Sequence, residues 1–462
     1  MSGKIKKLTI VGLYGSTNIS VPIKDNQLIL VGKNGLGKST FINFLFFILS
    51  KQWTKLVEAD FTSVKLETSD GQITLERSAL SEELRWRDEG INRFPQRYIR
   101  FLNELRDEGK LGEFFQTKDE SALREYAARL GTPSIMSIRR FRDDAKQFYP
   151  TDVQSVIRAA SKFIDSLVGD RQILYLPTYR RIEKDLRIVI PELDEYIKRY
   201  NDSPSRTKTS TRAGGAYLEL VEFGMEDVQK KFDDTISELK DNARQVFNEL
   251  AGSYLRDVIR GQGQTYNKDE ILVLKDGDVK DILNRVEENT LSEPDKRLLQ
   301  ESIARLSDPS NSTQDDAYIA HIFSKLISTS RALQEKETPL RKFINACNKY
   351  LEGKRIIYNE MKYLIDVFDE KGRRVDLQYL SSGEKQIVSL FSHLYLGYKR
   401  TYMIIIDEPE LSLSMPWQHT FLPDIMSSGH CDFIAAVTHS PFISDNDFDK
   451  YTIDMKKCVK SS

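Results

Sequence analysis

One nine-residue segment limits what this chain can fold into more than any other. Residues 32–40 read Gly-Lys-Asn-Gly-Leu-Gly-Lys-Ser-Thr, which fits the pattern G-x-x-x-x-G-K-[ST]. An apolar run at residues 28–31 precedes this phosphate loop, and an apolar helical pattern follows it. Such a loop needs a strand before it and a helix after it, because its backbone N–H groups must converge on a phosphate. The segment therefore predicts an α/β fold with a nucleoside triphosphate site.

The residues of the phosphate loop have distinct expected roles. The glycines let backbone amides approach the phosphates, Lys38 is expected to reach the β- and γ-phosphates, and Ser39 is expected to offer its hydroxyl to Mg²⁺. The loop residues that we expect to bind ATP are Asn34, Gly35, Gly37, Lys38, Ser39 and Thr40. ATP and Mg²⁺ are thus the expected cofactors.

A second motif lies near the other end of the chain. The apolar run at residues 402–406 ends in Asp407 and Glu408, as expected for a parallel strand that is buried on both faces. Because α/β sheets bind ligands at the carboxyl edge of such strands, we expect Asp407 to hold the Mg²⁺ and Glu408 to polarise the attacking water. Taken alone, the pair could equally well be a solvated turn.

A third motif, the signature loop, occupies residues 380–386 with the sequence Leu-Ser-Ser-Gly-Glu-Lys-Gln. It opens an apolar helical run, and a helix N-terminus of this kind can bind an anion. By itself, Ser before Gly-Glu is also an ordinary N-cap. Together with the other two motifs, the segment predicts a further phosphate contact from Ser381, Ser382 and Gly383.

These three motifs, in this order, make the chain resemble the ABC-type ATPases of the SMC, RecF and overcoming-lysogenisation-defect group. The resemblance covers both ends of the chain and implies an ABC-type P-loop ATPase head assembled from both ends, with a helical insertion between them. It also implies an ATP-gated homo-oligomer in which Ser382 and Gly383 of one head contact the γ-phosphate held by Lys38 of another. Residues 410–414 match the family's D-loop.

A buried strand pattern at residues 433–438 ends in His439, which looks like the family's switch histidine. We assign it a catalytic role together with Glu408. The chain departs from the family pattern in two places. Ser414 stands where many relatives carry His, and no glutamine is clearly the metal-sensing residue of the Q-loop. Gln52 is the nearest candidate, although a polar residue that closes the preceding helix is the interpretation we favour.

Composition limits the class of protein further. The chain has 462 residues, 40% of them hydrophobic, which is enough for one substantial core and a smaller second domain. Its 68 Lys and Arg residues and 69 Asp and Glu residues give a formal net charge of −1, which does not indicate general nucleic-acid binding. A local basic patch is compatible with this net charge. The cysteines show no C-x-x-C spacing, which indicates a reducing compartment. Because no signal-peptide core or membrane-length apolar run is present, we expect a cytoplasmic protein without a membrane partner.

The predicted domain organisation has five segments. They are the N-terminal lobe of the head at 1–80, a helical insertion within the head at 81–165, a core strand at 166–185, a helical or coiled-coil insertion at 186–370, and the C-terminal lobe at 371–462. Within the first lobe, alternating segments around residues 69–71 predict a hairpin.

Two parts of the central region have open interpretations. The pair Arg180-Arg181 follows the core strand, where it could meet a phosphate or a partner, or be ordinary surface charge. Residues 201–216 have the composition of a linker or flexible tip.

Two helical blocks dominate the second insertion. One has a near-heptad seam from Met225 to Leu250, and the other runs from Ile319 to Leu351 with an expected break near Pro339. Paired, blocks of about 35 residues would form an arm roughly 50 Å long. A compact helical subdomain is the alternative, and we slightly favour a bent arm or lid.

Few residues follow His439, whereas overcoming-lysogenisation-defect nucleases continue there into a Toprim domain. We therefore expect any cutting to be done by a separate partner. The whole organisation resembles the ATPase subunits of two-component anti-phage systems, the AriA family of PARIS first and the PtuA family of Septu second. This resemblance implies a multimer that controls a Toprim-type or HNH-type nuclease effector and responds to a phage-encoded trigger protein. The alternative is a RecF-like DNA-repair ATPase that clamps DNA, so DNA binding is left open.

Overall fold

The computed structural model describes residues 3–132, 134–146, 156–177, 217–219, 225–263, 271, 276–286, 291–306, 314–397 and 400–461. The chain forms two compact units, one from Met1–Val221 with Arg400–Ser462 and one from Glu222–Lys399. Our interpretations of Arg180-Arg181 and of residues 201–216 concern positions outside the described residues. Within the described residues, no helix is both long and apolar enough to cross a membrane.

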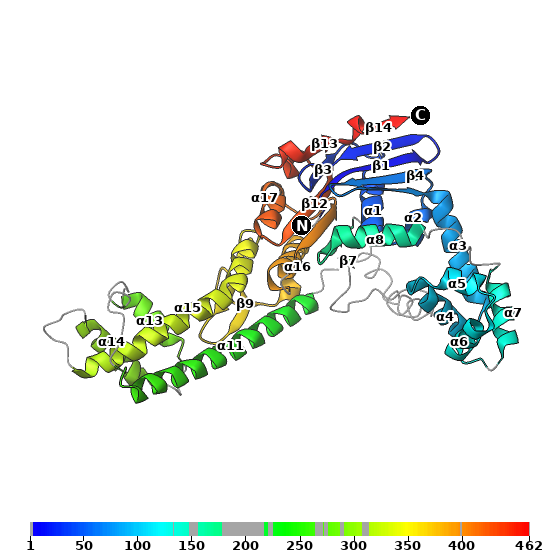
Figure 1. Cartoon of the computed structure of the whole chain (residues 1–462). Coiled ribbons are helices and arrows are strands. Elements are labelled where there is room, and N and C mark those ends of the chain that lie inside the picture. The colour runs from blue at the N-terminus through cyan, green and yellow to red at the C-terminus, as the bar shows by residue number, and fades with distance from the viewer. Residues whose placement is uncertain are drawn as a thin grey trace. The chain divides into compact units, whose positions relative to one another are not determined.

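A parallel sheet forms the centre of the first unit. In the described part of the chain it has six strands in the order β13-β3-β12-β11-β6-β7, and every neighbouring pair is parallel. The strands are β3 (Gln27–Val31), β6 (Gln172–Leu176), β7 (Tyr217–Glu219), β11 (Tyr402–Asp407), β12 (Cys431–Thr438) and β13 (Thr452–Asp454). In Figure 1 the blue N-terminal strands lie beside the orange and red C-terminal ones. The predicted head assembled from both ends of the chain is thus confirmed.

A second, antiparallel sheet has the order β14-β2-β1-β4-β5. Its strands are β1 (Ile5–Leu13), β2 (Thr17–Pro22), β4 (Ser63–Thr68), β5 (Gln72–Glu76) and β14 (Val459–Ser461). The predicted hairpin is β4 with β5, and the Thr68 N–H donates to the Gly71 carbonyl at 2.8 Å to close it.

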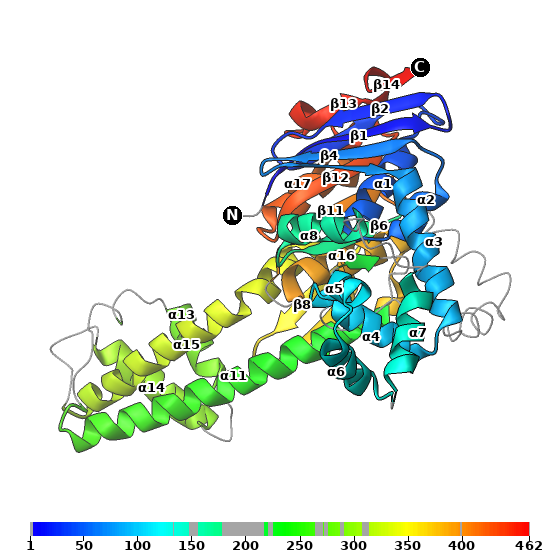
Figure 2. The ribbon, with the colours of Figure 1, turned by 45° about the vertical axis from the view of Figure 1, so that its right-hand side comes forward.

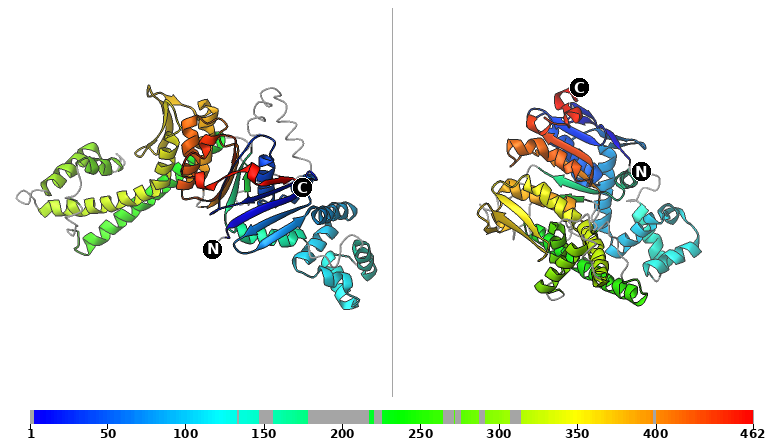
Figure 3. Two further views of the ribbon diagram at one scale, coloured as in Figure 1. Left: turned by 90° about the horizontal axis from the view of Figure 1, so that it is seen from above. Right: turned by 90° about the vertical axis from the view of Figure 1, so that its left-hand side faces the viewer.

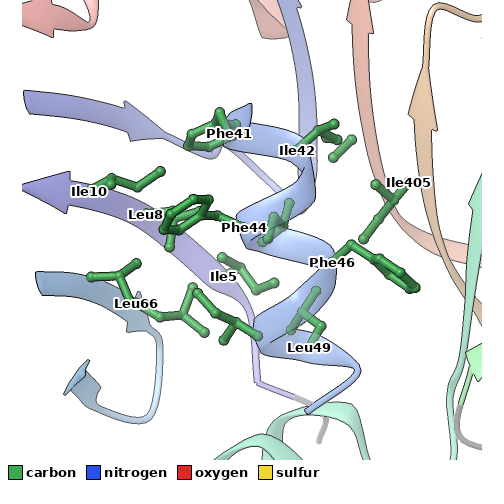
Figure 4. Close-up of a cluster of buried hydrophobic side chains, with 14 of the residues drawn as sticks. Ile5, Leu8, Ile10, Phe41, Ile42, Phe44, Phe46, Leu49, Leu66 and Ile405 are labelled. Carbon is green, nitrogen blue, oxygen red and sulfur yellow. The ribbon is translucent and has the colours of Figure 1, made fainter. Parts of the chain in front are cut away.

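Helix α1 (Lys38–Leu49) follows the phosphate loop and packs among strands of both sheets. Phe41, Phe44 and Phe46 are fully buried, and Figure 4 shows them pointing to different sides of the helix. Phe46 stacks on Tyr175 of β6 with ring centroids 4.2 Å apart. A helix that is apolar on all sides must be buried, so α1 gives the phosphate loop a fixed support.

Most of the other helices of the first unit lie within residues 77–168, the region where we expected a helical insertion. They are α2 (Trp53–Glu58), α3 (Arg77–Arg93), α4 (Gln96–Asp107), α5 (Leu111–Gln116), α6 (Glu120–Leu130), α7 (Ile135–Lys146), α8 (Val156–Val168) and α17 (Met415–Ser427). Helices α4–α7 share a core of their own, in which the aromatic rings of Phe101, Phe114 and Phe141 meet.

The second unit contains the predicted helical blocks as two long helices, α11 (Met225–Ile259) and α15 (Gln314–Asn348). They lie side by side in Figures 2 and 3, and the rings of Phe232 and Phe343 meet between them at 5.5 Å. Each has 35 residues, so each is roughly 50 Å long. Helices α13 (Asp276–Asn284) and α14 (Glu293–Leu306) pack against α15 in a small hydrophobic core. The paired arm of α11 and α15 therefore also carries a small compact bundle that includes α13 and α14.

The expected break near Pro339 was wrong. Helix α15 runs through Pro339 without interruption to Asn348. A proline in a helix interior costs about 3 kcal/mol, because it removes one hydrogen bond and crowds the preceding turn. Leu340 and Phe343 on the next turn are fully buried, and burying two such side chains offsets a cost of that size.

The rest of the second unit is a three-stranded antiparallel sheet and helix α16 (Ser382–Leu396). The strands are β8 (Lys354–Asn359), β9 (Leu364–Asp369) and β10 (Arg374–Val375). Helix α16 packs against α11 and α15. Lys231 of α11 donates to the Ser392 hydroxyl of α16 at 3.4 Å, and burial lowers the pKa of Lys231 to about 7. We placed the start of the C-terminal lobe at 371, whereas this compact unit extends to Lys399.

Candidate functional site

Three neighbouring parallel strands bring the predicted site residues of the first unit together. Strand β12 lies between β3 and β11, and its register pairs Thr438 with Val31 and Val437 with Asp407. The phosphate loop, the Asp407-Glu408 pair and His439 therefore leave the sheet at the same carboxyl edge. This is the edge at which open α/β sheets bind their ligands.

The phosphate loop has the backbone that its glycines permit. Gly35 and Gly37 have φ angles of 80° and 84°, in the left-handed region that other residues rarely adopt. Gly37 is also the N-cap of α1 and offers no side-chain cap to the first turn. An N-terminus of this kind directs backbone N–H groups and the positive end of the helix dipole toward an anion. Asn34 and Gly35 are exposed on the loop, and Thr40 is half-buried on the first turn.

Lys38 places its ammonium group across the loop. Its Nζ donates to the carbonyls of Gly32 at 2.8 Å and Lys33 at 2.9 Å, and it lies 2.9 Å from Nε2 of His439. Burial lowers the pKa of Lys38, and the nearby carboxylates of Glu408, Asp407 and Glu410 oppose that effect. An ammonium held in this way is a fixed positive charge at the position where phosphates are expected.

Ser39 and Asp407 form the pair that fits a magnesium ion. The Ser39 hydroxyl donates to Oδ1 of Asp407 at 3.3 Å, and Asp407 is only 3% exposed. Mg²⁺ prefers oxygen ligands and is usually held by one or two protein groups together with substrate phosphates. Within the described residues, no group of three or more His, Cys, Asp or Glu could hold a metal by itself. The oxygen pair suits an ion that arrives with a nucleotide.

Glu408 has a backbone conformation that is rare for a side chain of its kind. Its φ is 53°, and its N–H donates to the carbonyl of Val437 at 2.8 Å. Left-handed non-glycine residues are concentrated at functional sites, where the surrounding structure maintains them. Oε1 of Glu408 lies 3.8 Å from Nε2 of His439, and its side chain is 25% exposed. A partly exposed carboxylate beside an imidazole can accept a proton from water.

Glu410 makes contacts at the candidate site that the sequence reasoning missed. Its carboxylate accepts hydrogen bonds from the Thr438 hydroxyl at 2.7 Å, the His439 N–H at 2.7 Å and the Ser440 N–H at 3.2 Å. It therefore fixes the backbone that carries His439. The sequence placed Glu410 only in the D-loop, and no local signal pairs it with a segment almost thirty residues later.

The signature residues lie in the second unit, at the start of α16. Ser381 is the N-cap, and with Glu384 it forms a capping box in which each side chain accepts from the other residue's N–H. Glu384 is buried and also accepts from Nζ of Lys354 at 3.0 Å through both oxygens. Ser381 and Ser382 are exposed, whereas Gly383 is buried. The exposed serines stand at a helix N-terminus that is rigidly capped.

The structure shows the surroundings of Ser414 and Gln52, the two positions at which the chain departs from the family pattern. Ser414 is the N-cap of α17, but its side chain makes no capping hydrogen bond. Nε2 of Gln52 donates to the Ser50 hydroxyl at 2.9 Å, just after α1 ends. This contact agrees with the interpretation of Gln52 as a residue that closes the helix.

Comparison with known proteins identifies a family. The family model described as AAA ATPase domain (AAA_15) matches residues 4–443. No curated protein matches the chain. Three solved structures of Smc head domains are similar over most of their length. The first, with an extended coiled coil and bound to the C-terminal domain of ScpA, derives from Pyrococcus furiosus; it is 13% identical over 100% of this chain and 96% of its own, with a TM-score of 0.33.

The second, an SmcHead bound to the C-winged helix domain of ScpA, is 10% identical over 95% of this chain and 90% of its own, with a TM-score of 0.31. The third, a Smc head domain with a coiled coil and joint from Pyrococcus yayanosii, is 12% identical over 96% of this chain and 93% of its own, with a TM-score of 0.28.

Proposed function

The chain belongs to the AAA ATPase domain family, and from this premise we propose that it works as an ABC-type ATPase head of the SMC, RecF and overcoming-lysogenisation-defect group. One observation supports this proposal above the others. The phosphate loop, Asp407-Glu408 and His439 meet at one carboxyl edge, although they come from opposite ends of the chain. That arrangement serves ATP binding and hydrolysis.

In this proposal each residue of the edge has one task. Lys38 and the loop amides bind the phosphates, while Ser39 and Asp407 hold Mg²⁺, which neutralises charge on the phosphates when it is bound. Glu408 orients and deprotonates the attacking water. His439 lies within reach of both Lys38 and Glu408 and contacts the γ-phosphate.

We further propose that two heads join around ATP. The exposed Ser381 and Ser382 and the backbone of Gly383 on one protomer contact the γ-phosphate bound by another. An ATP held between two protomers provides the differential binding that a change from open to closed heads requires, which is several kcal/mol. Hydrolysis then loosens the assembly.

The test compares assembly with turnover. Glu408→Gln is expected to retain ATP and to accumulate assembled heads, measured by light scattering with and without ATP, while phosphate release stops. Lys38→Ala is expected to lose both binding and assembly. Glu335→Gln on α15, an exposed carboxylate outside the site, serves as the matched control and should behave as the wild type. Assembly of the Glu408→Gln protein that is independent of ATP would refute the shared-ATP arrangement.

At the next level we propose a sensor and scaffold role in an anti-phage system, as in AriA of PARIS, with PtuA of Septu as the sibling. The ATPase head would hold a separate nuclease, Toprim-type or else HNH-type, and release it in response to a phage-encoded trigger. What supports this role is the organisation of the chain, with a split head around a modest helical arm. A long chromosome-structuring coiled coil would need far more than the roughly 50 Å that these helices span.

The deciding experiment is mass photometry after co-purification with the product of the adjacent reading frame. A large complex that retains a nuclease in the native protein, and changes in Lys38→Ala, is the expected result. A monomer or dimer that shifts only when duplex DNA and ATP are both added would instead favour a RecF-like DNA clamp, whose binding would weaken steeply with salt.

A further inference from the structure

The second unit contains a cavity of about 780 Å³ that the ATPase site does not use. It lies between α13, α15 and the turn that joins β8 to β9. Its volume is in the range of small-molecule sites. The lining is mostly polar or charged and includes Asp281, Asn284, Arg285, Ser330, Arg341 and Glu360.

A buried carboxylate anchors two arginines at this cavity. Glu337 is 1% exposed and accepts from both terminal guanidinium nitrogens of Arg285, Nη1 at 3.2 Å and Nη2 at 3.1 Å. Arg341 donates to the same carboxylate at 2.9 Å, and so does the Tyr358 hydroxyl at 3.2 Å. Removing one member of a buried ion pair leaves a costly uncompensated charge, so Glu337 is a permanent counterion.

Glu360 is a counterion of a different kind. It follows β8 in the turn and accepts hydrogen bonds from both Arg285 and Arg341, one through each oxygen. Its side chain is 33% exposed, whereas that of Arg285 is 7% exposed. The two arginines thus face one buried carboxylate and one partly exposed carboxylate. Of these two carboxylates, only that of Glu360 is reached by solvent to a substantial extent.

One further observation, an unpaired buried hydroxyl, indicates a prepared site. Ser330 lines the cavity and is 5% exposed, and among the described residues its hydroxyl has no hydrogen-bond partner. Buried hydroxyls are nearly always paired, so an unpaired one beside a cavity indicates a missing partner. Burial lowers the pKa of Arg341, but Glu360 and Glu337 outweigh that effect and hold the pKa above its ordinary value.

We propose that this cavity binds a small organic anion whose carboxylate or phosphate group takes the place of Glu360 on Arg285 and Arg341. The exchange replaces one anion by another, so no uncompensated charge is left buried. Guanidinium forks match the oxygens of both groups in bidentate geometry. Ser330 and the α13 groups Asp281 and Asn284 then bind the polar remainder of the ligand. Glu360 competes with the ligand, so its removal exposes the affinity of the open site.

The experiment titrates the full-length protein with acetate, citrate and inorganic phosphate at constant ionic strength and with saturating Mg·ADP. Calorimetry and thermal shift are the readouts. Glu360→Ala should bind at least one of these probes about tenfold or more tightly than the wild type. Glu360→Ala combined with Arg341→Gln should lose that gain. Glu335→Ala, which removes an exposed carboxylate of α15 outside the cavity, is the matched control and should leave affinity unchanged.

The probes also separate the two sources of the anion. Binding of acetate and citrate, but not phosphate, identifies a carboxylate ligand, and the reverse identifies a phosphate ester. Glu360→Asp, which keeps the charge but shortens the side chain, replaces Glu360→Ala if the latter unfolds, and it should show a smaller gain in the same direction. The proposal is overturned if no probe binds more tightly to the Glu360 variants, or if the gain survives Arg341→Gln. These outcomes do not depend on ATP turnover, so they are independent of the ATPase proposal.

Discussion

Glu410 offers the sharpest test of how the tertiary structure positions the candidate site at the carboxyl edge of the sheet. Its carboxylate accepts three hydrogen bonds from the residues that carry and flank His439. In Glu410→Gln, the amide keeps the shape of the side chain but replaces one acceptor oxygen by a donor. With its NH2 toward the Thr438 hydroxyl, the glutamine carbonyl still accepts from the His439 and Ser440 N–H groups, but as a neutral acceptor, and the hydroxyl must turn to accept.

The magnitude follows from the bonds that are lost. A hydrogen bond to a charged group contributes about 1.5 to 3 kcal/mol and one between neutral groups about 0.5 to 1.5 kcal/mol, and the substitution turns all three bonds into neutral ones. Water can replace part of the loss, because Glu410 is only half-buried. We therefore expect roughly 2 to 3 kcal/mol less restraint on the segment. If the whole amount reaches the transition state, kcat falls about 30- to 160-fold.

The assay is steady-state phosphate release, with kcat and KM determined separately. We expect kcat to fall while KM for ATP changes little, because Lys38 and the phosphate loop are untouched. Glu410→Asp should recover part of the rate, since it restores the charge. Asp447→Asn, an exposed carboxylate of the same C-terminal region, is the control. A Glu410→Gln protein whose kcat stays within twofold of the wild type would refute the positioning role.

Three further predictions concern stability. Lys231→Met should raise the free energy of unfolding by roughly 4 to 5 kcal/mol below pH 7, because the buried ammonium has a pKa of about 7 in place of 10.5. Between pH 7 and 10.5 the unfolded wild-type chain binds more protons than the folded one, so the stability of the wild type rises with pH. The advantage of Lys231→Met over the wild type, measured by urea titration, should therefore shrink across this range. An equal advantage at pH 6 and pH 10 would contradict this prediction. Phe44→Ala should cost about 3 to 5 kcal/mol in the same assay, whereas Leu255→Ala, at a side chain that is 60% exposed, should cost far less. Pro339→Ala should stabilise the protein by up to about 3 kcal/mol, and destabilisation would mean that the ring packs usefully in α15.

Local patterns predicted the elements of the head well. The phosphate loop, the strand before Asp407 and the hairpin of β4 and β5 each follow from a few consecutive residues. In those segments glycine conformations, apolar runs or alternation specify the backbone directly. The apolar seam from Met225 likewise predicted α11, because its period is that of a helix face.

The failures share a cause. Pro339 ends a helix when only local preference acts, but buried contacts on the next turn outweigh that preference in α15. The sequence placed Glu410 in the D-loop motif only, because no residue near it in the sequence reveals that β12 ends beside it. The charged cavity of the second unit was not anticipated, because Arg285, Glu337 and Glu360 are distant in sequence and each alone resembles surface charge.

The sequence by itself determined the class of chemistry, since a phosphate loop is specified by nine adjacent residues whose backbone geometry is largely local. It also predicted which residues would act on ATP. Only the tertiary structure decided that β3, β12 and β11 are neighbours, that Glu410 holds the segment of His439, and that Arg285 and Arg341 share the Glu360 carboxylate. The physical reason is that these features depend on burial and pairing between distant segments, and the free energy of such contacts exists only once the chain has packed.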